Sequence, residues 1–282
     1  MKNLIRVKDY RKLPLLLFGL AVLVTACEEG TTVRDADYPD QLIYMPAAVG
    51  GRFVINDIAR KIGDTPVPGN PYRYVVDLPN RNFIVPLGVY RAGVDNVGEF
   101  TVNIAVNNDT INRIIVEAEA DSTSADSTIS LLPSGQYTMV NSVTMQHGEE
   151  LAKFDLVIDL DFLRNNYPDS VYALGVSISS PDRETNPDLS TAIVVIHAKI
   201  MKPTAAFSFS PDESDPNTIV FTNNSAMATD YTWDFGDGSE TSDEENPSHT
   251  YSTAGTYTVM LTAIGITSDE DKSIAADTVS IL

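Results

Sequence analysis

The feature that most constrains the fold is an alternation over positions 154–162, in which one side is wholly apolar and the other side carries Asp155, Val157, Asp159 and Asp161. The apolar members are Phe154, Leu156, Ile158, Leu160 and Phe162. A period of two puts one face of a β-strand in a core and the other face in water. We therefore predict a half-buried strand here, with a brief helical turn as an option over residues 161–166.

Short segments rich in β-branched and aromatic residues recur along the chain, bounded by Gly, Pro, Asn or Asp, as is typical of strands. They cover residues 42–45, 53–55, 72–76, 82–90, 99–106, 137–140, 143–145, 171–179 and 192–200. No segment shows a long amphipathic helical period, and residues 114–119 fit either a strand or a helix. The pattern predicts an all-β protein made of immunoglobulin-like sandwiches.

The first 26 residues have a different composition from the rest. Five Lys and Arg residues stand against Asp9 in the first twelve positions, and residues 13–24 are nearly all apolar. A basic segment followed by a short apolar run is typical of a secretory signal. The run is shorter than the ~20 residues that cross a bilayer, so we predict a signal peptide over residues 1–26.

Cys27, the only cysteine of the chain, stands where the apolar run stops. The residues Val24-Thr25-Ala26-Cys27 resemble the bacterial lipobox, which implies that Cys27 is lipidated and becomes the first residue of the mature protein. The alternative is a free or buried cysteine after an ordinary signal peptide. Residues 27–41 are predicted to form an acidic tether.

Glu28 and Glu29 follow directly and resemble the surface-export signal of Bacteroidota lipoproteins. The resemblance implies a protein that is lipid-anchored in the outer membrane and faces the cell surface. The periplasmic face of that membrane is the alternative.

The charge of the chain excludes several classes of partner. The net charge is −20, and it becomes −24 from Cys27 on because the signal segment is basic. Binding to phosphate backbones needs clustered Lys and Arg, so we expect no nucleic-acid partner. A single cysteine also excludes an intrachain disulfide and a cysteine-based zinc site.

Residues 42–202 are predicted to form the first of two β-sandwich domains. Several stretches in this range resemble a domain of unknown function at the N-terminus of Bacteroidota surface lipoproteins and some secreted glycosidases. The stretches are residues 85–91, 132–137, 157–163 and 186–195. The resemblance implies an immunoglobulin-like sandwich that accompanies glycan-uptake systems and has no defined catalytic motif.

Residues 203–282 carry a more specific pattern. Trp233-Asp234-Phe235-Gly236-Asp237-Gly238 is followed by Asn-Pro-Ser-His-Thr-Tyr at 246–251 and Gly-Thr-Tyr-Thr-Val at 255–259. This set resembles the PKD domain, named for the polycystic kidney disease protein. We interpret the motif as structural: Trp233 fills the core, Gly236 and Gly238 permit a tight turn, and Asp234 and Asp237 cap it.

The best candidate glycan site is a polar and aromatic patch around one presumed strand and turn. It consists of Tyr72, Tyr74, Asn80, Arg81 and Asn82. Tyr72 and Tyr74 would point the same way on a strand, as a platform for a sugar ring requires. The alternative is that both tyrosines belong to the core.

No catalytic constellation is recognisable in the sequence. His147, His197 and His249 lack metal-ligand spacing, and we interpret Asp159 and Asp161 as a solvated strand face rather than a glycosidase pair. We therefore expect no metal and no cofactor. Calcium is the alternative, at the acidic clusters within residues 212–215 and 243–245, although neither cluster has the spacing of a calcium loop.

These observations predict a non-catalytic surface lipoprotein that binds glycan or assists an outer-membrane glycan-uptake complex. The alternative is a structural or adhesive lipoprotein that contacts other proteins and binds no sugar. The expected partners are a glycan, uptake proteins of the outer membrane, and the membrane itself through the lipid on Cys27.

Overall fold

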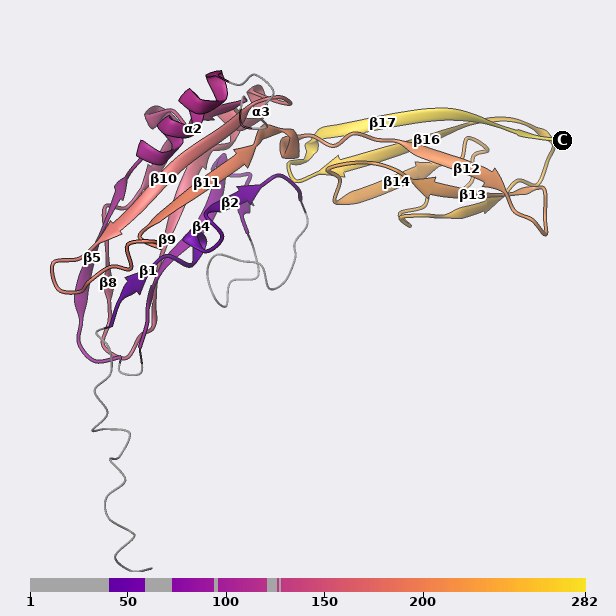
Figure 1. Cartoon of the computed structure of the whole chain (residues 1–282). Helices are drawn as coiled ribbons and strands as arrows, with labels where there is room; N and C mark the ends of the chain where they lie inside the picture. Colours follow the sequence, from indigo (N-terminus) through magenta and orange to yellow (C-terminus); the bar gives the residue numbers. More distant parts are fainter. Residues whose placement is uncertain (1–40, 59–72, 94–95, 121–125, 127) are drawn as a thin grey trace, which may run out of the picture. The chain divides into compact units, whose positions relative to one another are not determined.

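A computed structural model describes residues 41–58, 73–93, 96–120, 126 and 128–282. Residues 41–282 form one compact unit. We call residues 42–202 the first module and residues 203–282 the second module, after the boundaries expected from the sequence. Both are built from β-strands (Figure 1), so the predicted all-β class with immunoglobulin-like sandwiches is confirmed.

Two sheets form the first module. The first sheet has the strand order β1-β4-β9-β7, and β3 also pairs with β4. The second sheet has the strand order β2-β11-β10-β5-β8, and β6 also pairs with β10. The first sheet comprises β1 (Ile43–Tyr44), β3 (Val75–Asp77), β4 (Asn82–Arg91), β7 (Tyr137–Met139) and β9 (Leu151–Asp159). The second comprises β2 (Arg52–Ile55), β5 (Phe100–Val106), β6 (Ile129–Leu131), β8 (Ser142–Met145), β10 (Val171–Ser179) and β11 (Thr191–His197).

The alternating segment forms β9 and supplies one wall of the core. Phe154, Leu156 and Ile158 are buried between the sheets, whereas Lys153 and Asp155 face solvent. The strand ends at Asp159, whose carboxylate accepts a hydrogen bond from the Phe162 N–H at 2.8 Å. That cap starts α3 (Leu160–Asn165), so the helical turn that was an option over residues 161–166 is present.

The helix α2 (Asp109–Ala120) was not expected as a long helix. The prediction that no segment is a long amphipathic helix is therefore wrong, and residues 114–119 are helical rather than extended. Ile111 is buried and Ile115 packs beside it, against a small cluster that includes Val171 and Ile193. Figure 1 shows α2 beside β10, so the second sheet is covered on its outer face as well as its inner face.

Gly175 lets the segment before α2 approach β10 closely. A side chain at this position would place its Cβ 1.8 Å from the Asn107 carbonyl oxygen. The backbone N–H of Asn107 donates to the Gly175 carbonyl at 2.9 Å, and Asn108 Oδ1 accepts from the Gly175 N–H at 2.9 Å. The helix is thus fixed to the sheet at its N-terminal end.

Three 3₁₀ turns connect strands in the first module. They are η3 (Pro46–Ala48), η4 (Ser134–Gln136) and η5 (Ala198–Met201). The last of these leads directly into the second module, and Ile200 and Met201 are fully buried in the core of the first.

The second module consists of two three-stranded sheets, β12-β13-β15 and β14-β16-β17. The strands are β12 (Phe207–Pro211), β13 (Thr218–Asn223), β14 (Asp230–Asp234), β15 (Ser248–Thr250), β16 (Gly255–Gly265) and β17 (Ser268–Ile281). Their inner faces enclose an aromatic core in which Trp233 is fully buried. The rings of Phe207 and Phe221 lie 5.2 and 5.3 Å from the Trp233 ring.

Candidate functional site

Three of the five predicted site residues come together at the hairpin between β3 and β4. Asn80 and Arg81 lie in the turn, and Asn82 is the first residue of β4. Tyr74 lies just before β3, and its ring stacks on Phe83 at a centroid distance of 4.8 Å. That face of Tyr74 therefore packs on the core instead of facing solvent. Tyr72 lies outside the described residues.

The hairpin turn forms one wall of a pocket of about 230 Å³. Residues 80–82, 135–138 and 157–159 line it. The second wall comes from η4 and β7, because β7 pairs with β9 in the register Tyr137↔Ile158 and Thr138↔Val157. On the other side of β9, Asn82 pairs with Asp159. Three segments far apart in the sequence thus meet around one hollow.

Besides the Tyr137 phenol, three side chains with an amide or hydroxyl group around this pocket make no hydrogen bond to any described part of the chain. They are Asn82, Gln136 and Thr138. Asn82 and Gln136 are half-buried and Thr138 is exposed. Side-chain amides both donate and accept hydrogen bonds, so the pocket presents donors and acceptors that the described chain does not use.

Asn80, Arg81 and Asp159, which also line the pocket, are already engaged within the protein. Asn80 donates from Nδ2 to Asp77 at 2.8 Å, which closes the turn, and the Asp159 carboxylate caps α3. The Arg81 guanidinium binds Asp161 and donates from Nη1 to both carboxylate oxygens of Glu270 at 2.7 and 2.8 Å. The hydrogen bonds to these two carboxylates, with Asp161 contributing most, raise the pKa of Arg81, so Arg81 is a structural cation at the rim.

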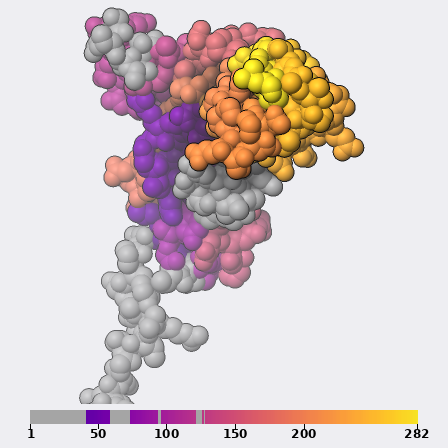
Figure 2. Space-filling view, turned by 90° about the vertical axis from the view of Figure 1, so that its right-hand side faces the viewer, coloured from indigo at the N-terminus to yellow at the C-terminus, as the bar shows by residue number. Residues whose placement is uncertain are grey.

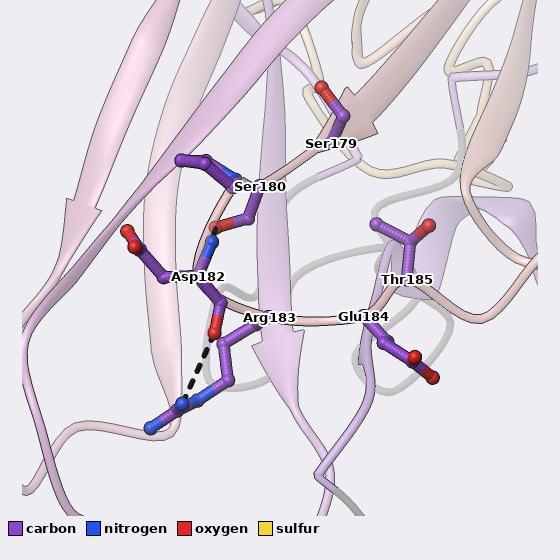
Figure 3. Close-up of a pocket in the computed structure, with 7 residues that line it drawn as sticks. Ser179, Ser180, Asp182, Arg183, Glu184 and Thr185 are labelled. Carbon is purple, nitrogen blue, oxygen red and sulfur yellow. Dashed lines mark hydrogen bonds between the residues drawn. The ribbon is translucent and has the colours of Figure 1, made fainter.

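A second hollow, of about 490 Å³, lies in the loop between β10 and β11. Residues 179–185 line it. Ser180 Oγ donates to the Thr101 carbonyl at 2.6 Å and accepts from the Asp182 N–H at 3.2 Å. Arg183 donates to the Asp182 and Val97 carbonyls. Figure 3 shows the Arg183 and Glu184 side chains diverging from the loop, so they do not converge on a common ligand position.

The Arg183 guanidinium also lies 5.3 Å above the Phe100 ring, a cation–π contact that anchors the loop. The polar groups of this hollow therefore serve mainly to hold the loop itself. The pocket at the hairpin is the better candidate site.

The Trp-Asp-Phe-Gly-Asp-Gly motif lies at the end of β14. The Trp233 indole N–H donates to the Glu244 carbonyl at 3.0 Å, and Asp234 accepts from the Gly236 N–H at 2.9 Å. Gly236 and Gly238 have φ of +78° and +80°, where glycine is favoured. A Cβ at Gly236 would lie 2.3 Å from the Thr258 carbonyl oxygen. These contacts all shape the turn.

Asp237 closes the motif onto β15. Its carboxylate accepts from the Ser239 N–H at 3.0 Å and lies 2.8 Å from His249 Nε2. Burial raises the pKa of Asp237, but the hydrogen bonds from Ser239 and His249 outweigh burial and lower it to about 2. His249 in turn stacks flat on Phe235 at 4.1 Å. These contacts of Asp237 and Phe235 with His249 hold the motif against β15.

Within the part of the chain that the structure describes, no three His, Cys, Asp or Glu side chains are placed to hold a metal ion. His147 accepts from the Gly98 N–H, and burial lowers the pKa of His197. In the acidic cluster at 212–215, Asp212 accepts from the Ser214 N–H and Asp215 from the Asn217 N–H. Those carboxylates stabilise turns.

The described residues contain no helix with the length and apolar character needed to cross a membrane. Cys27, the predicted signal peptide and most of the predicted tether lie outside the described residues. In the space-filling view, the second module (orange to yellow) shows no deep hollow on the face toward the viewer (Figure 2).

Fold and site together define a two-module, all-β protein with a polar pocket on its first module. Two family models match the chain: the PKD domain over residues 200–281, and a family described as an N-terminal domain over residues 62–185. The chain thus has this N-terminal domain followed by a PKD domain.

Solved structures similar to this chain include one isolated PKD domain and two proteins that match more than two thirds of the chain. The PKD1 domain of a Vibrio cholerae metalloprotease is 29% identical, with 28% of this chain and 96% of that chain covered and a TM-score of 0.25. An auxiliary nutrient binding protein from Bacteroides thetaiotaomicron is 16% identical, with 80% and 69% covered and a TM-score of 0.34. A Bacteroides ovatus protein of unknown function is 11% identical, with 71% and 85% covered and a TM-score of 0.34.

Sequence reasoning missed half of the pocket. It selected the turn at 80–82 but not Gln136 and Thr138, which come from a different part of the sheet. The stretch at 132–137 was noticed only for its family resemblance. No pattern within that stretch indicates that β7 pairs with β9. The sequence therefore gave no direct signal that these residues form the second wall of the pocket.

Proposed function

We propose that this protein is a non-catalytic lipoprotein of the outer-membrane surface that binds glycan, either alone or within an uptake complex. The resemblance of residues 24–27 to a lipobox and the basic and apolar segment before it support the anchor. Two or more acyl chains make membrane attachment stable.

The observation that carries the binding function is the set of solvent-accessible polar side chains around the pocket of the first module. Asn82, Gln136 and Thr138 offer amide and hydroxyl groups without an intramolecular partner in the described chain. Ligand sites use a few placed polar groups of this kind to fix orientation and specificity. A sugar, with hydroxyls that both donate and accept, matches them.

The charge of the protein favours a neutral glycan over an acidic one. The mature chain carries −24. The pocket includes Asp159, and Arg81, the cation among its lining residues, is already bound to two carboxylates. A polyanion would meet repulsion that no free cation of the lining offsets.

Isothermal titration of the mature protein against a panel of neutral and acidic polysaccharides tests the proposal. Binding of a neutral glycan is expected, and Asn82→Ala or Gln136→Ala should weaken it. Each lost hydrogen bond is expected to raise Kd about threefold to tenfold. The exposed Asn103 on β5 of the opposite sheet provides the control, Asn103→Ala, which should leave Kd unchanged. Null titrations across the panel would contradict glycan binding.

The anchor has a separate test. Cells labelled with a fatty-acid analogue should incorporate it into the wild-type protein and not into Cys27→Ser. Mass spectrometry of the N-terminal peptide should begin at an acylated Cys27. A mature protein that starts elsewhere, or that carries no acyl group, would overturn the lipoprotein assignment while leaving glycan binding open to its own test.

One observation favours the second candidate function, contact with other proteins. Met260 and Ile274 are 40% and 61% exposed, and they share the outer face of the β14-β16-β17 sheet because Thr262 pairs with Ile274. Cross-linking on cells should then capture a partner through this face, and Ile274→Lys should abolish capture without changing glycan titrations.

A further inference from the structure

The turn between β16 and β17 makes contacts outside its own sandwich. Thr267 at its tip is fully buried, and its hydroxyl lies 3.5 Å from the Met201 carbonyl. Ile266 from the turn and Met227 pack against the hydrophobic core of the first module. The second module therefore closes part of the first module's core, which a spacer connected only by a linker would not do.

Six charged side chains surround this apolar contact. The first module supplies Arg81, Asp161 and Arg164, Lys202 follows η5, and the second module supplies Glu270 and Asp271. We call these six the junction network. They carry three positive and three negative charges, so the network is neutral in a chain that is otherwise strongly acidic.

In the junction network, each of the two guanidinium groups contacts more than one carboxylate. Arg81 bridges Asp161 and Glu270. Arg164 donates from Nε to Asp271 at 2.6 Å, and its Nη1 lies 3.1 Å from Asp161 and 2.8 Å from Glu270. Asp271 is only 9% exposed and also accepts from the Thr267 hydroxyl at 2.9 Å. Guanidinium–carboxylate pairs of this kind fix direction as well as distance.

Arg81 connects the junction network to the candidate pocket. Its backbone has a φ of +58°, in the left-handed region that non-glycine residues rarely adopt. Its N–H donates to the Leu78 carbonyl at 3.2 Å and its carbonyl accepts from the Leu160 N–H at 3.0 Å. The unfavourable conformation is held by contacts of both backbone and side chain, and Glu270 from the second module is one of them.

We propose that Glu270 is a positioning residue for the pocket: through Arg81 it fixes the turn that carries Asn80 and Asn82, so the second module takes part in ligand binding. The link to binding rests on the function proposed above, whereas the positioning of the turn does not. The PKD module is then a component of the site and more than a spacer.

Hydrogen–deuterium exchange on the full mature protein tests the positioning directly. Glu270→Gln should speed exchange of the amides at residues 78–82 about threefold or more. Glu240→Gln provides the control, because Glu240 is exposed and in no described ion pair, and it should leave these amides unchanged. Equal exchange in Glu270→Gln and wild type would overturn the proposal, whether or not any glycan binds.

A double-mutant cycle separates positioning from general loss of stability. Arg81→Gln and Glu270→Gln should each speed exchange, and the double variant should add less than the sum of the two. Arg81→Lys keeps the positive charge but loses the planar guanidinium that binds two carboxylates. This variant should retain part of the protection of residues 78–82 from exchange. Strictly additive effects would count against a direct Arg81–Glu270 link.

The consequence for binding is measured by titrations with the neutral glycan identified for wild type. Glu270→Gln should raise Kd about threefold to tenfold, and high salt should weaken wild-type binding toward that of the variant because salt screens the junction network. Faster exchange with an unchanged Kd would overturn the second module's part in binding. A wild-type protein that binds no glycan would refute the proposed function, and exchange alone would then decide the positioning.

Discussion

The two modules are stabilised by cores of different composition. The second module packs a compact aromatic cluster around one tryptophan, with Phe221, Phe235 and Tyr251 in the same cluster. The first module buries mainly aliphatic residues between two larger sheets and adds a helix over one of them. The second module thus fills a small core with a few large rings, whereas the first fills a larger core with many smaller side chains.

The largest expected effect tests the aromatic core. Trp233→Ala should destabilise the second module by about 3–5 kcal/mol, because a fully buried tryptophan leaves a large cavity. Differential scanning calorimetry of the mature protein measures the change. Thr232→Ala, next to it on the outward face of β14, should change stability by less than about 0.5 kcal/mol. A loss under ~1 kcal/mol for Trp233→Ala would contradict the conclusion that this ring is a main contributor to the stability of the second module.

An intermediate effect is expected where α2 covers the first module. Ile111 is 1% exposed and Val116 on the same helix is 65% exposed. Ile111→Ala should cost about 2–4 kcal/mol through lost packing, and Val116→Ala should be neutral or slightly stabilising because alanine favours helix. Urea unfolding followed by circular dichroism compares the two. Similar values for both variants would mean that α2 is not part of the folded core.

The smallest expected effect is a loss of stability of the second module at low pH. The pKa of Asp237 is lowered to about 2 in the folded state, so its stabilising effect is complete above the ordinary pKa of an aspartate and is lost as the pH falls from about 4 to 2. The loss should be about 1 kcal/mol, less than the full shift would give, because solvent near the carboxylate screens its interactions. Trp233 is the only tryptophan, so its fluorescence follows unfolding of the second module alone.

Asp237→Asn is the matched control for that titration. It should be less stable than wild type at pH near 6 and should lose less stability on acidification, since the carboxylate is gone. Parallel pH curves for wild type and variant would show that Asp237 does not contribute to the acid sensitivity of the second module.

The strands were predictable and the helix was not, for a physical reason. Strands such as β9 are marked by an alternation that only Val157 interrupts over residues 154–162, and the motif around Trp233 indicates the second module. In α2 the run Ile114-Ile115-Val116 is β-branched, which favours strands, and only the spacing of Ile111, Ile115 and Ala118 is helical. The continuous apolar run in β11 was a further signal, because a strand buried on both faces needs a covering layer.

The candidate site was predictable only where it is local in sequence. Asn80 and Asn82 belong to one hairpin, which turn residues mark clearly. Gln136 and Thr138 depend on the pairing of β7 with β9, and Glu270 depends on a contact 189 residues from Arg81. Register and long-range contacts follow from the whole fold, so no local pattern contained them.

The pairing of β2 with β11 has a consequence for how the protein matures. Arg52 lies beside Ile193 and Ile55 beside Ile196 in parallel register, so β2, near the start of the sandwich, must wait for β11 before it can join its sheet. Contacts this distant in sequence form slowly, whereas β16 and β17 meet across a short turn. The C-terminal sandwich can therefore form early from strands that are close in sequence, whereas β2 completes its sheet only after β11 is available.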